Sequence, residues 1–190
     1  MKILTKEEID VNKDVILEVI RNGALFIHPT DTIYGIGCNA TQEDFVEQVR
    51  EIKGRPSSPF SVIAPSKEWI KKNCVVKGEA EKWLDKLPGP YTIVLKLKKK
   101  GVIAPNIAPG LDTLGIRIPD HWFSKIVEEL GIPIVTTSAN KAGGDFMTSL
   151  DDLDDEINPK IEFVIYEDEK HGRPSKILDL TGKEVKIKER

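Results

Sequence analysis

Lys53 and Arg55 are two cations separated by one residue, and their types and spacing suit the binding of an anion. They follow a segment with helical spacing and precede an apolar segment at 60–64 that is typical of a strand. A lysine and an arginine placed together could bind phosphate or carboxylate oxygens. Cations are also common at helix C-termini, where they interact favourably with the helix dipole. The pair alone leaves both interpretations open.

Two other segments favour the anion-site interpretation. Arg117 interrupts an apolar strand expected at 114–119, and an arginine inside a strand needs an anionic partner. Ser138 and Asn140 begin a polar, glycine-containing loop directly after a strand expected at 133–137. Loops at strand ends are where α/β sheets commonly bind their ligands. Together with Lys53 and Arg55, these segments predict a site for an anionic ligand.

Other motifs carry less chemistry. The stretch GIGCNA at 35–40 matches a relaxed dinucleotide-binding fingerprint, but residues 29–37 separate the preceding strand from the second glycine, so we expect the glycines to form a tight turn. His28 has no Asp or Glu beside it to orient it as a base and is expected to be structural. Ser138 lacks a G-x-S-x-G elbow, which argues against a hydrolase nucleophile. The carboxylates at 151–156 are expected to form a solvated helix face.

Composition narrows the function classes. A chain of 190 residues fits one domain spanning 1–190. The net charge of -3 argues against a protein whose main task is to grip a phosphate backbone, and nine acidic residues against one lysine concentrate at 151–169. Two cysteines, Cys38 and Cys74, without further Cys or His at metal spacing argue against a disulfide framework and a zinc site. With no apolar stretch of membrane-span length and no signal-like N-terminus, we expect a cytoplasmic protein.

The periodicity predicts strands that alternate with helices. Asn12 is expected to cap a helix closed by Gly23, Thr41 with Asp44 to form a capping box for a helix ending near Gly54, and Ser66 to cap a short helix. Further helices are expected at 78–87 and 121–130, and strands at 2–4, 24–28, 60–64, 91–97, 114–119, 133–137, 163–166 and 176–180. This order indicates an α/β domain. The lack of a helix between the strands around 91–118 favours a mixed sheet.

Five ordered motifs resemble those of the YrdC-type threonylcarbamoyl-AMP synthases and together cover nearly the whole chain: HPTDTIYGIGCNA, KGRP, LDTLGIRIPDH, TTSANKAGG and PSKILDL. The resemblance implies a twisted open mixed sheet with flanking helices and a concave cationic cavity. It also implies a reaction in which L-threonine, bicarbonate and ATP give threonylcarbamoyl-AMP and pyrophosphate. That product is the intermediate in threonylcarbamoyl adenosine (t6A) modification of tRNA.

The resemblance also implies roles for individual residues. The family's K-x-R and S-x-N signature falls on the expected catalytic set, Lys53, Arg55, Ser138 and Asn140. The implied threonine-binding set is Thr32, Arg117, Ser138 and Ser175, and the implied ATP-binding set is Lys53, Arg55, Thr113, Asn140 and Thr148. A magnesium ion is expected to arrive with ATP, held by phosphate oxygens and water rather than by a protein cage. No tightly bound organic cofactor is expected.

Some positions depart from the family pattern. The segment after Arg55 is one residue shorter than usual, Ile63 stands where a histidine is often found, and Lys176 stands where threonine is usual. Arg190 lies near where the family commonly has a nucleotide-binding arginine.

Two other functions remain open. The first is an RNA-binding or translation-associated module of the same fold that has lost the reaction. The second is a carbamoyl-adenylate former of the hydrogenase-maturation type, against which the missing zinc-finger and acylphosphatase-like segments argue. For the synthase, the expected partners are ATP, L-threonine, bicarbonate, a contact with tRNA or double-stranded RNA, and a downstream t6A transferase complex, with no membrane.

Overall fold

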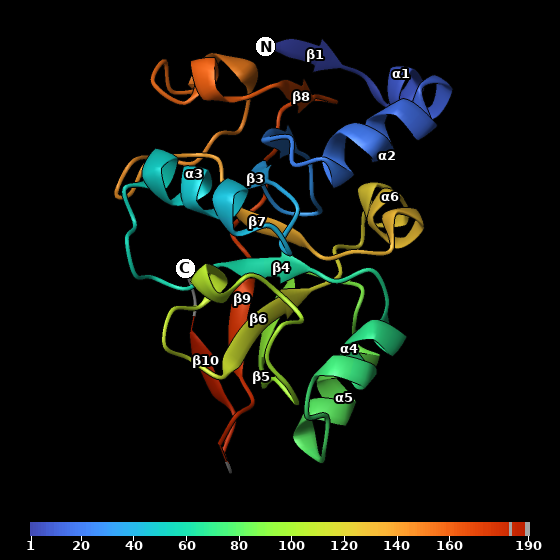
Figure 1. Cartoon of the computed structure of the whole chain (residues 1–190), viewed down its shortest axis with the longest axis vertical. Helices are drawn as coiled ribbons and strands as arrows, with labels where there is room; N and C mark the ends of the chain where they lie inside the picture. Colours follow the sequence, from blue (N-terminus) through green and yellow to red (C-terminus); the bar gives the residue numbers. More distant parts are fainter. Residues whose placement is uncertain (183, 189–190) are drawn as a thin grey trace.

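The computed structural model describes residues 1–182 and 184–188, and Figure 1 shows their arrangement around one twisted sheet. The strands lie side by side in the order β1 (Lys2–Leu4), β8 (Phe163–Ile165), β2 (Phe26–His28), β3 (Gly35–Gly37), β7 (Ile134–Ser138), β4 (Ser61–Ile63), β6 (Thr113–Arg117), β5 (Tyr91–Lys96), β9 (Lys176–Asp179) and β10 (Lys186–Lys188). The helices are α1 (Lys6–Val11), α2 (Lys13–Arg21), α3 (Glu43–Lys53), α4 (Lys67–Asn73), α5 (Glu79–Asp85) and α6 (Phe123–Leu130), with short 3₁₀ turns η1 (Pro105–Ile107), η2 (Leu150–Asp152) and η3 (Asn158–Lys160).

The expected mixed α/β sheet is confirmed. Strands β4 and β6 pair in parallel, as do β5 and β9, whereas β5 with β6 and β4 with β7 are antiparallel. The antiparallel β5–β6 pair comes from the chain segment in which no helix was expected. Each of the eight expected strands and the five expected helices has a counterpart in the structure, shifted by a few residues at its ends.

The prediction of a tight turn at the two glycines was wrong. Gly35 and Gly37 belong to β3, which pairs antiparallel with both β2 and β7. The glycines are required by crowding, because a Cβ on Gly35 would lie 3.1 Å from the His28 ring and a Cβ on Gly37 would lie 2.9 Å from it. A segment with such weak strand propensity is held in the sheet by its two neighbours.

Helix boundaries also needed correction. Helix α1 was not expected, although Thr5 and Glu8 form its capping box. The capping box predicted for Thr41 and Asp44 is absent, because the N-cap of α3 is Gln42 and the Thr41 hydroxyl donates instead to Asn39 Oδ1 at 2.7 Å. Asn12 occupies the N-cap of α2 without a side-chain cap bond. Strand β10 was not expected either.

Other caps agree with the prediction. Gly54 ends α3 in the left-handed conformation (φ 58°), as glycine does readily. The Ser66 side chain accepts the N–H of Trp69 and caps α4. The carboxylates at 151–156, expected on a solvated helix face, do not form a helix face: Asp151 and Asp152 belong to the turn η2, where Asp152 forms a capping box with Ser149, and the others follow that turn.

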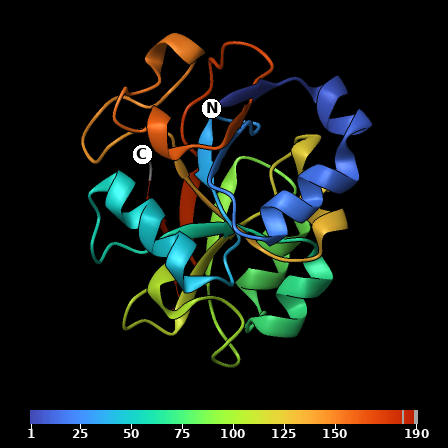
Figure 2. The same ribbon diagram turned by 45° about the horizontal axis from the view of Figure 1, so that its top comes forward.

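The helices cover the two faces of the sheet unevenly (Figures 1 and 2). Helices α1, α2 and α6 enclose a core with Phe26, Phe163, Ile63 and Ile134 on one face. The other face packs against α3 and α5 and forms the larger core. Side chains alternate along a strand, so Thr136 and Ser138 lie on the same face of β7 as Ile134. This face therefore changes from apolar to polar along β7.

Among the described residues, no helix is both long and apolar enough to cross a membrane.

Candidate functional site

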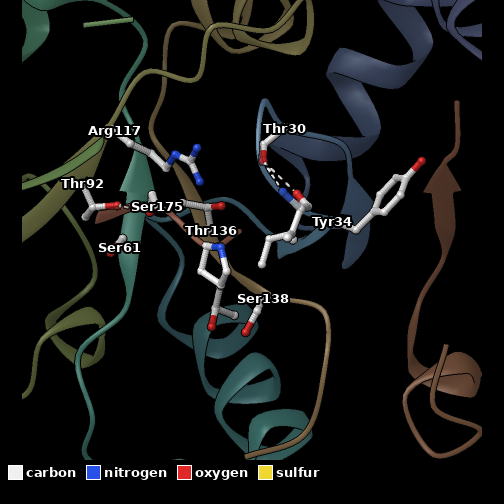
Figure 3. Close-up of a pocket in the computed structure, with 12 residues that line it drawn as sticks. Thr30, Tyr34, Ser61, Thr92, Arg117, Thr136, Ser138 and Ser175 are labelled. Carbon is white, nitrogen blue, oxygen red and sulfur yellow. Dashed lines mark hydrogen bonds between the residues drawn. The ribbon is translucent and has the colours of Figure 1, made fainter. Parts of the chain in front are cut away.

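A polar hollow lies where this face of the sheet becomes polar. Figure 3 shows Arg117 extending from β6 toward the space between Thr30 and Ser175. The hollow is lined by residues from several strand ends and loops: Thr30, Ile33, Tyr34, Gly35, Ser61, Thr92, Arg117, Thr136, Thr137, Ser138, Pro174 and Ser175. The lining is rich in hydroxyl groups around one guanidinium, which suits a small polar ligand that carries a carboxylate.

Arg117 has the anionic partner that its place in a strand required. Its Nη2 donates to Asp31 Oδ1 at 2.5 Å, and both side chains are almost fully buried, at 6% and 10% exposure. Thr32 Oγ1 lies 3.4 Å from both Nη1 and Nη2. Thr30 Oγ1 in turn lies 3.0 Å from Thr32 Oγ1. The turn at 30–32 therefore holds the guanidinium from one side.

Ser175 closes the hollow from a different segment. Its Oγ lies 2.8 Å from Thr92 Oγ1, so the segment before β9 is bonded to the start of β5 (Figure 3). Gly172 lies directly against Thr32: a Cβ at this position would be 2.3 Å from the Thr32 carbonyl oxygen. The segment at 171–175 therefore passes across the turn that holds Arg117.

Lys53, Ser138 and Asn140 form one hydrogen-bonded group. The side chain of Lys53 is fully buried, and its Nζ donates to Ser138 O and to Asn140 Oδ1, both at 2.6 Å, as well as to Asn140 O. Ser138 Oγ donates to Asn140 Oδ1 at 2.5 Å. Lys53 is thus more than a helix-end cation. It joins the end of α3 to the loop that follows β7.

Arg55 is placed by a residue that the sequence prediction missed. Arg50 is buried, and its Nη1 donates to the carbonyl oxygens of Arg55 at 2.7 Å and Ser58 at 3.0 Å, while its Nε donates to Asn106 O. Its guanidinium also lies 4.6 Å from the centre of the Phe60 ring. The available signal was an arginine placed directly beside Val49 on the apolar face of α3. The side chain of Arg55 itself is half-buried.

The structure brings together only part of the predicted ATP-binding set. Asn140 and Thr148 line a second, open hollow beyond Ser138, together with Lys141, Gly144, Asp145, Phe146, Asp152 and Asp154. The Thr148 hydroxyl donates to Asp152 Oδ2 at 2.6 Å, so toward a ligand this oxygen is an acceptor. Thr113 lines neither hollow. It lies on the same face of β6 as Arg117, four residues earlier.

The hydroxyl lining of the hollow was largely missed. Ser61, Thr92 and Thr136 lie in strands that were predicted from their apolar residues, so the hydroxyl groups were not assigned to the site. Alternation was the available signal, because Ile93 after Thr92 and Val135 before Thr136 are buried apolar residues on the opposite face.

His28 is structural, as expected. Its ring is completely buried and stacks on Phe123, with ring centres 4.9 Å apart. Burial lowers its pKa to about 3, so the ring is neutral near pH 7. The cysteines are also buried, which raises the pKa of Cys74 to about 11 and that of Cys38 further. These thiols are poor nucleophiles.

Ile63 and Lys176, which depart from the family pattern, do not line the hollow, although Lys176 directly follows Ser175, which does. Ile63 is fully buried in the core against α6, and Lys176 is exposed at the start of β9. Arg190, to which the resemblance gave a nucleotide role, falls outside the described residues. In the described part of the chain, no cluster of three or more His, Cys, Asp or Glu side chains could hold a metal ion.

Comparison with known proteins agrees with this geometry. A protein of Methanocaldococcus jannaschii provisionally named as a threonylcarbamoyl-AMP synthase is 40% identical over 96% of this chain and 86% of its own length. The threonylcarbamoyl-AMP synthase of Pyrococcus abyssi is 36% identical over 85% of this chain, which spans only 48% of that protein. The crystal structure of P. abyssi Sua5 complexed with L-threonine matches with a TM-score of 0.86 and 31% identity, over 98% of this chain and 56% of that one.

A family model described as "Telomere recombination", the Sua5/YciO/YrdC model, matches residues 18–190. The match covers far more than half of the sequence and includes every strand and loop that contributes to the hollow. The chain therefore belongs to the Sua5/YciO/YrdC family.

Proposed function

We propose that this protein is an L-threonylcarbamoyladenylate synthase. L-Threonine and bicarbonate would give N-carboxythreonine and water, and a carbamate oxygen of this intermediate would then attack the α-phosphorus of ATP and release pyrophosphate. The observation that carries the proposal is the hollow itself. A buried guanidinium faces a ring of hydroxyls and adjoins, through Ser138, the buried group of Lys53 and Asn140.

The hollow suits threonine. Arg117 would pair with the carboxylate, since a planar guanidinium can bind both carboxylate oxygens at once. Ser175, Thr92 and Thr136 offer hydroxyls that can donate to or accept from the hydroxyl and amino groups of the substrate. Thr32, expected to contact threonine, would act mainly through its contact with Arg117.

ATP would lie toward the Lys53 end. Lys53 and Arg55 would stabilise the negative charge that develops as the α-phosphorus is attacked, and Ser138 and Asn140 would fix the position of the lysine amine. Because Asp145, Asp152 and Asp154 border the second hollow, we place the ribose hydroxyls rather than the phosphates near Thr148. Catalysis would rest mostly on positioning and electrostatics.

Magnesium would enter with the triphosphate, and its charge would help neutralise the leaving pyrophosphate. Ser138 Oγ, which donates its proton to Asn140 Oδ1, would accept a hydrogen bond from magnesium-bound water. Contact with tRNA, a downstream t6A transferase complex and a cytoplasmic location remain part of the proposal.

The test is a pyrophosphate-release assay with mass detection of threonylcarbamoyl-AMP. We expect release only when ATP, L-threonine and bicarbonate are all present. Asn140→Ala should abolish product formation, whereas Lys82→Met, which removes an exposed lysine amine, should not change it. Release of pyrophosphate without threonine would contradict the proposal. RNA binding that is steeply salt-dependent and survives Asn140→Ala, without any synthesis, would favour the RNA-binding alternative instead.

A further inference from the structure

Asp31 has no role in the proposed reaction, yet its carboxylate is one half of a buried ion pair. Its Oδ1 accepts from Arg117 Nη2 at 2.5 Å, and its Oδ2 accepts the backbone N–H of Asp120 at 3.1 Å. Within the described part of the chain, Arg117 lines the hollow and Asp31 does not. The carboxylate therefore neutralises the guanidinium without itself lining the hollow.

We propose that Asp31 makes the site selective for a zwitterionic amino acid over simple anions. The inference rests on the proposed function, in which the threonine carboxylate pairs with Arg117. The reaction also needs bicarbonate and a polyphosphate, both anions that an uncompensated buried guanidinium would bind. With Asp31 in place, the Arg117–Asp31 pair has no net charge, so an anion gains little electrostatic free energy when it binds in the hollow.

A zwitterion is treated differently from an anion by such a pair. Its carboxylate can still accept directional hydrogen bonds from Arg117, and its ammonium group is attracted to the carboxylate of Asp31. A ligand with the same carboxylate but no ammonium group still interacts with Arg117 and is repelled by Asp31, and it lacks the compensating attraction between an ammonium group and Asp31. Because both Arg117 and Asp31 are nearly buried, solvent screens these interactions weakly.

The charge of Asp31 can be separated from its geometry. In Asp31→Asn, the side-chain oxygen can still accept from Arg117, and Thr32 Oγ1 still lies beside both terminal nitrogens. The charge is lost together with one acceptor, because the amide nitrogen that replaces Oδ2 cannot accept the N–H of Asp120. Asp31→Glu keeps the charge. Asp120→Asn is the matched control, because it removes a neighbouring carboxylate while the backbone N–H that donates to Asp31 remains.

The experiment measures binding of L-threonine and of (R)-3-hydroxybutanoate, which has the same hydroxyl and carboxylate but no amine, by titration calorimetry near neutral pH. For wild type we expect threonine to bind at least about tenfold more tightly. In Asp31→Asn this preference should fall by about tenfold, which corresponds to about 1.4 kcal/mol, and the hydroxy acid should bind more tightly than it does to wild type. Asp31→Glu should keep the preference, and Asp120→Asn should change it less than about twofold.

The outcomes distinguish this inference from the proposed function. An unchanged preference in Asp31→Asn, with threonine still bound, would overturn the role of Asp31 alone. Failure of wild type to bind threonine would overturn the proposed function and the inference with it. If Asp31→Asn does not fold, as the loss of a buried counter-ion could cause, the wild-type comparison still decides, because equal binding of the two ligands excludes the selectivity.

Discussion

At the scale of single residues, Lys53 is the cation to which we assign the charge stabilisation in the proposed reaction. Its amine is fully buried and contacts two backbone carbonyls and one side-chain amide. A cation fixed in this way needs no reorganisation when charge builds up on a nearby phosphate, which is the main source of electrostatic catalysis. Arg117 lies on the other side of Ser138 and would act on the carboxylate of the substrate. In the proposed reaction the two cations would therefore have separate tasks.

We predict that Lys53→Met lowers kcat/KM for threonine-dependent pyrophosphate release by at least about a hundredfold. The affinity for threonine should change by only a few fold, because Arg117 and its partners Asp31 and Thr32 are untouched. Steady-state kinetics with calorimetry separates the two effects, and Lys82→Met serves as the control at an exposed position. An equal loss of threonine affinity would mean that Lys53 acts in threonine binding.

His28 gives the site a pH-dependent stability. The pKa of His28 is lowered from 6.5 to about 3, chiefly by burial and also by the charges of Arg117 and His121. The His28 side chain of the unfolded chain therefore takes up a proton below about pH 6.5, whereas that of the folded protein does not until about pH 3. The contribution of His28 to the free energy of unfolding is therefore complete above about pH 6.5 and is lost as the pH falls.

Urea denaturation of wild type should accordingly show a loss of stability on the order of 2 kcal/mol between about pH 7 and about pH 5 from this residue. His28→Leu should be less stable at about pH 7, because its shape differs from that of the ring stacked on Phe123, but its stability should fall less over the same range. Equal slopes for the two proteins would rule out His28 as the source.

At the scale of elements, the segment at 166–175 borders the hollow, since Pro174 and Ser175 line it. The Tyr34 hydroxyl donates to Asp168 O at 2.7 Å, and the Trp122 indole N–H donates to Glu167 Oε2 at 2.7 Å. Both bonds fix the start of this segment. At its other end, Gly172 lies against Thr32, and Ser175 bonds to Thr92. The segment is thus tied at both ends across the turn that holds Arg117.

Gly172→Ala should raise KM for threonine by about tenfold or more. The added methyl would lie 2.3 Å from the Thr32 carbonyl oxygen, so either the segment or the turn must move, and a small displacement near a site is costly. Gly182→Ala is the control, because its nearest neighbour would be 3.7 Å away. Unchanged kinetics in Gly172→Ala would show that the segment can move aside without affecting the substrate.

Helices and strands could be predicted from the sequence where the local pattern of residues determines the secondary structure. They could not be predicted where contacts with neighbouring strands determine it. Apolar strands such as β7 and capped helices such as α4 followed from periodicity and from Ser66. Strand β3 did not, because its glycines owe their place to β2, β7 and the His28 ring. In the site, the arginine's need for an anion was predicted, but its identity as Asp31, 86 positions away, depends on the tertiary fold.

At the scale of the whole molecule, the two cores share the same sheet. Val135 of β7 belongs to the larger core and Ile134 to the core against α2 and α6. Ligand binding between Arg117 and Ser138 would stabilise strands that contribute to both. Threonine at about a hundred times its dissociation constant should therefore add about 2.7 kcal/mol to the free energy of unfolding and raise Tm by roughly 5–10 °C.

Calorimetry should show this shift as one transition that moves as a whole, and Arg117→Gln should eliminate it. Glutamine is the conservative choice because it can still accept and donate hydrogen bonds in place of the buried guanidinium. Two transitions, of which threonine moves only one, would mean that the cores unfold independently.

The position of β7 has a further consequence for hydrogen exchange. Its residues pair with β3 on one side and with β4 on the other, and its last residue, Ser138, reaches the hollow. Each amide of this strand donates to one of these neighbours, and β3 and β4 are themselves paired with β2 and β6 on their other sides, so the amides of residues 135–137 should exchange with solvent deuterium among the slowest in the described part of the chain. Bound substrate would slow them further. The exchange rates of the β7 amides would then report whether substrate is bound in the hollow.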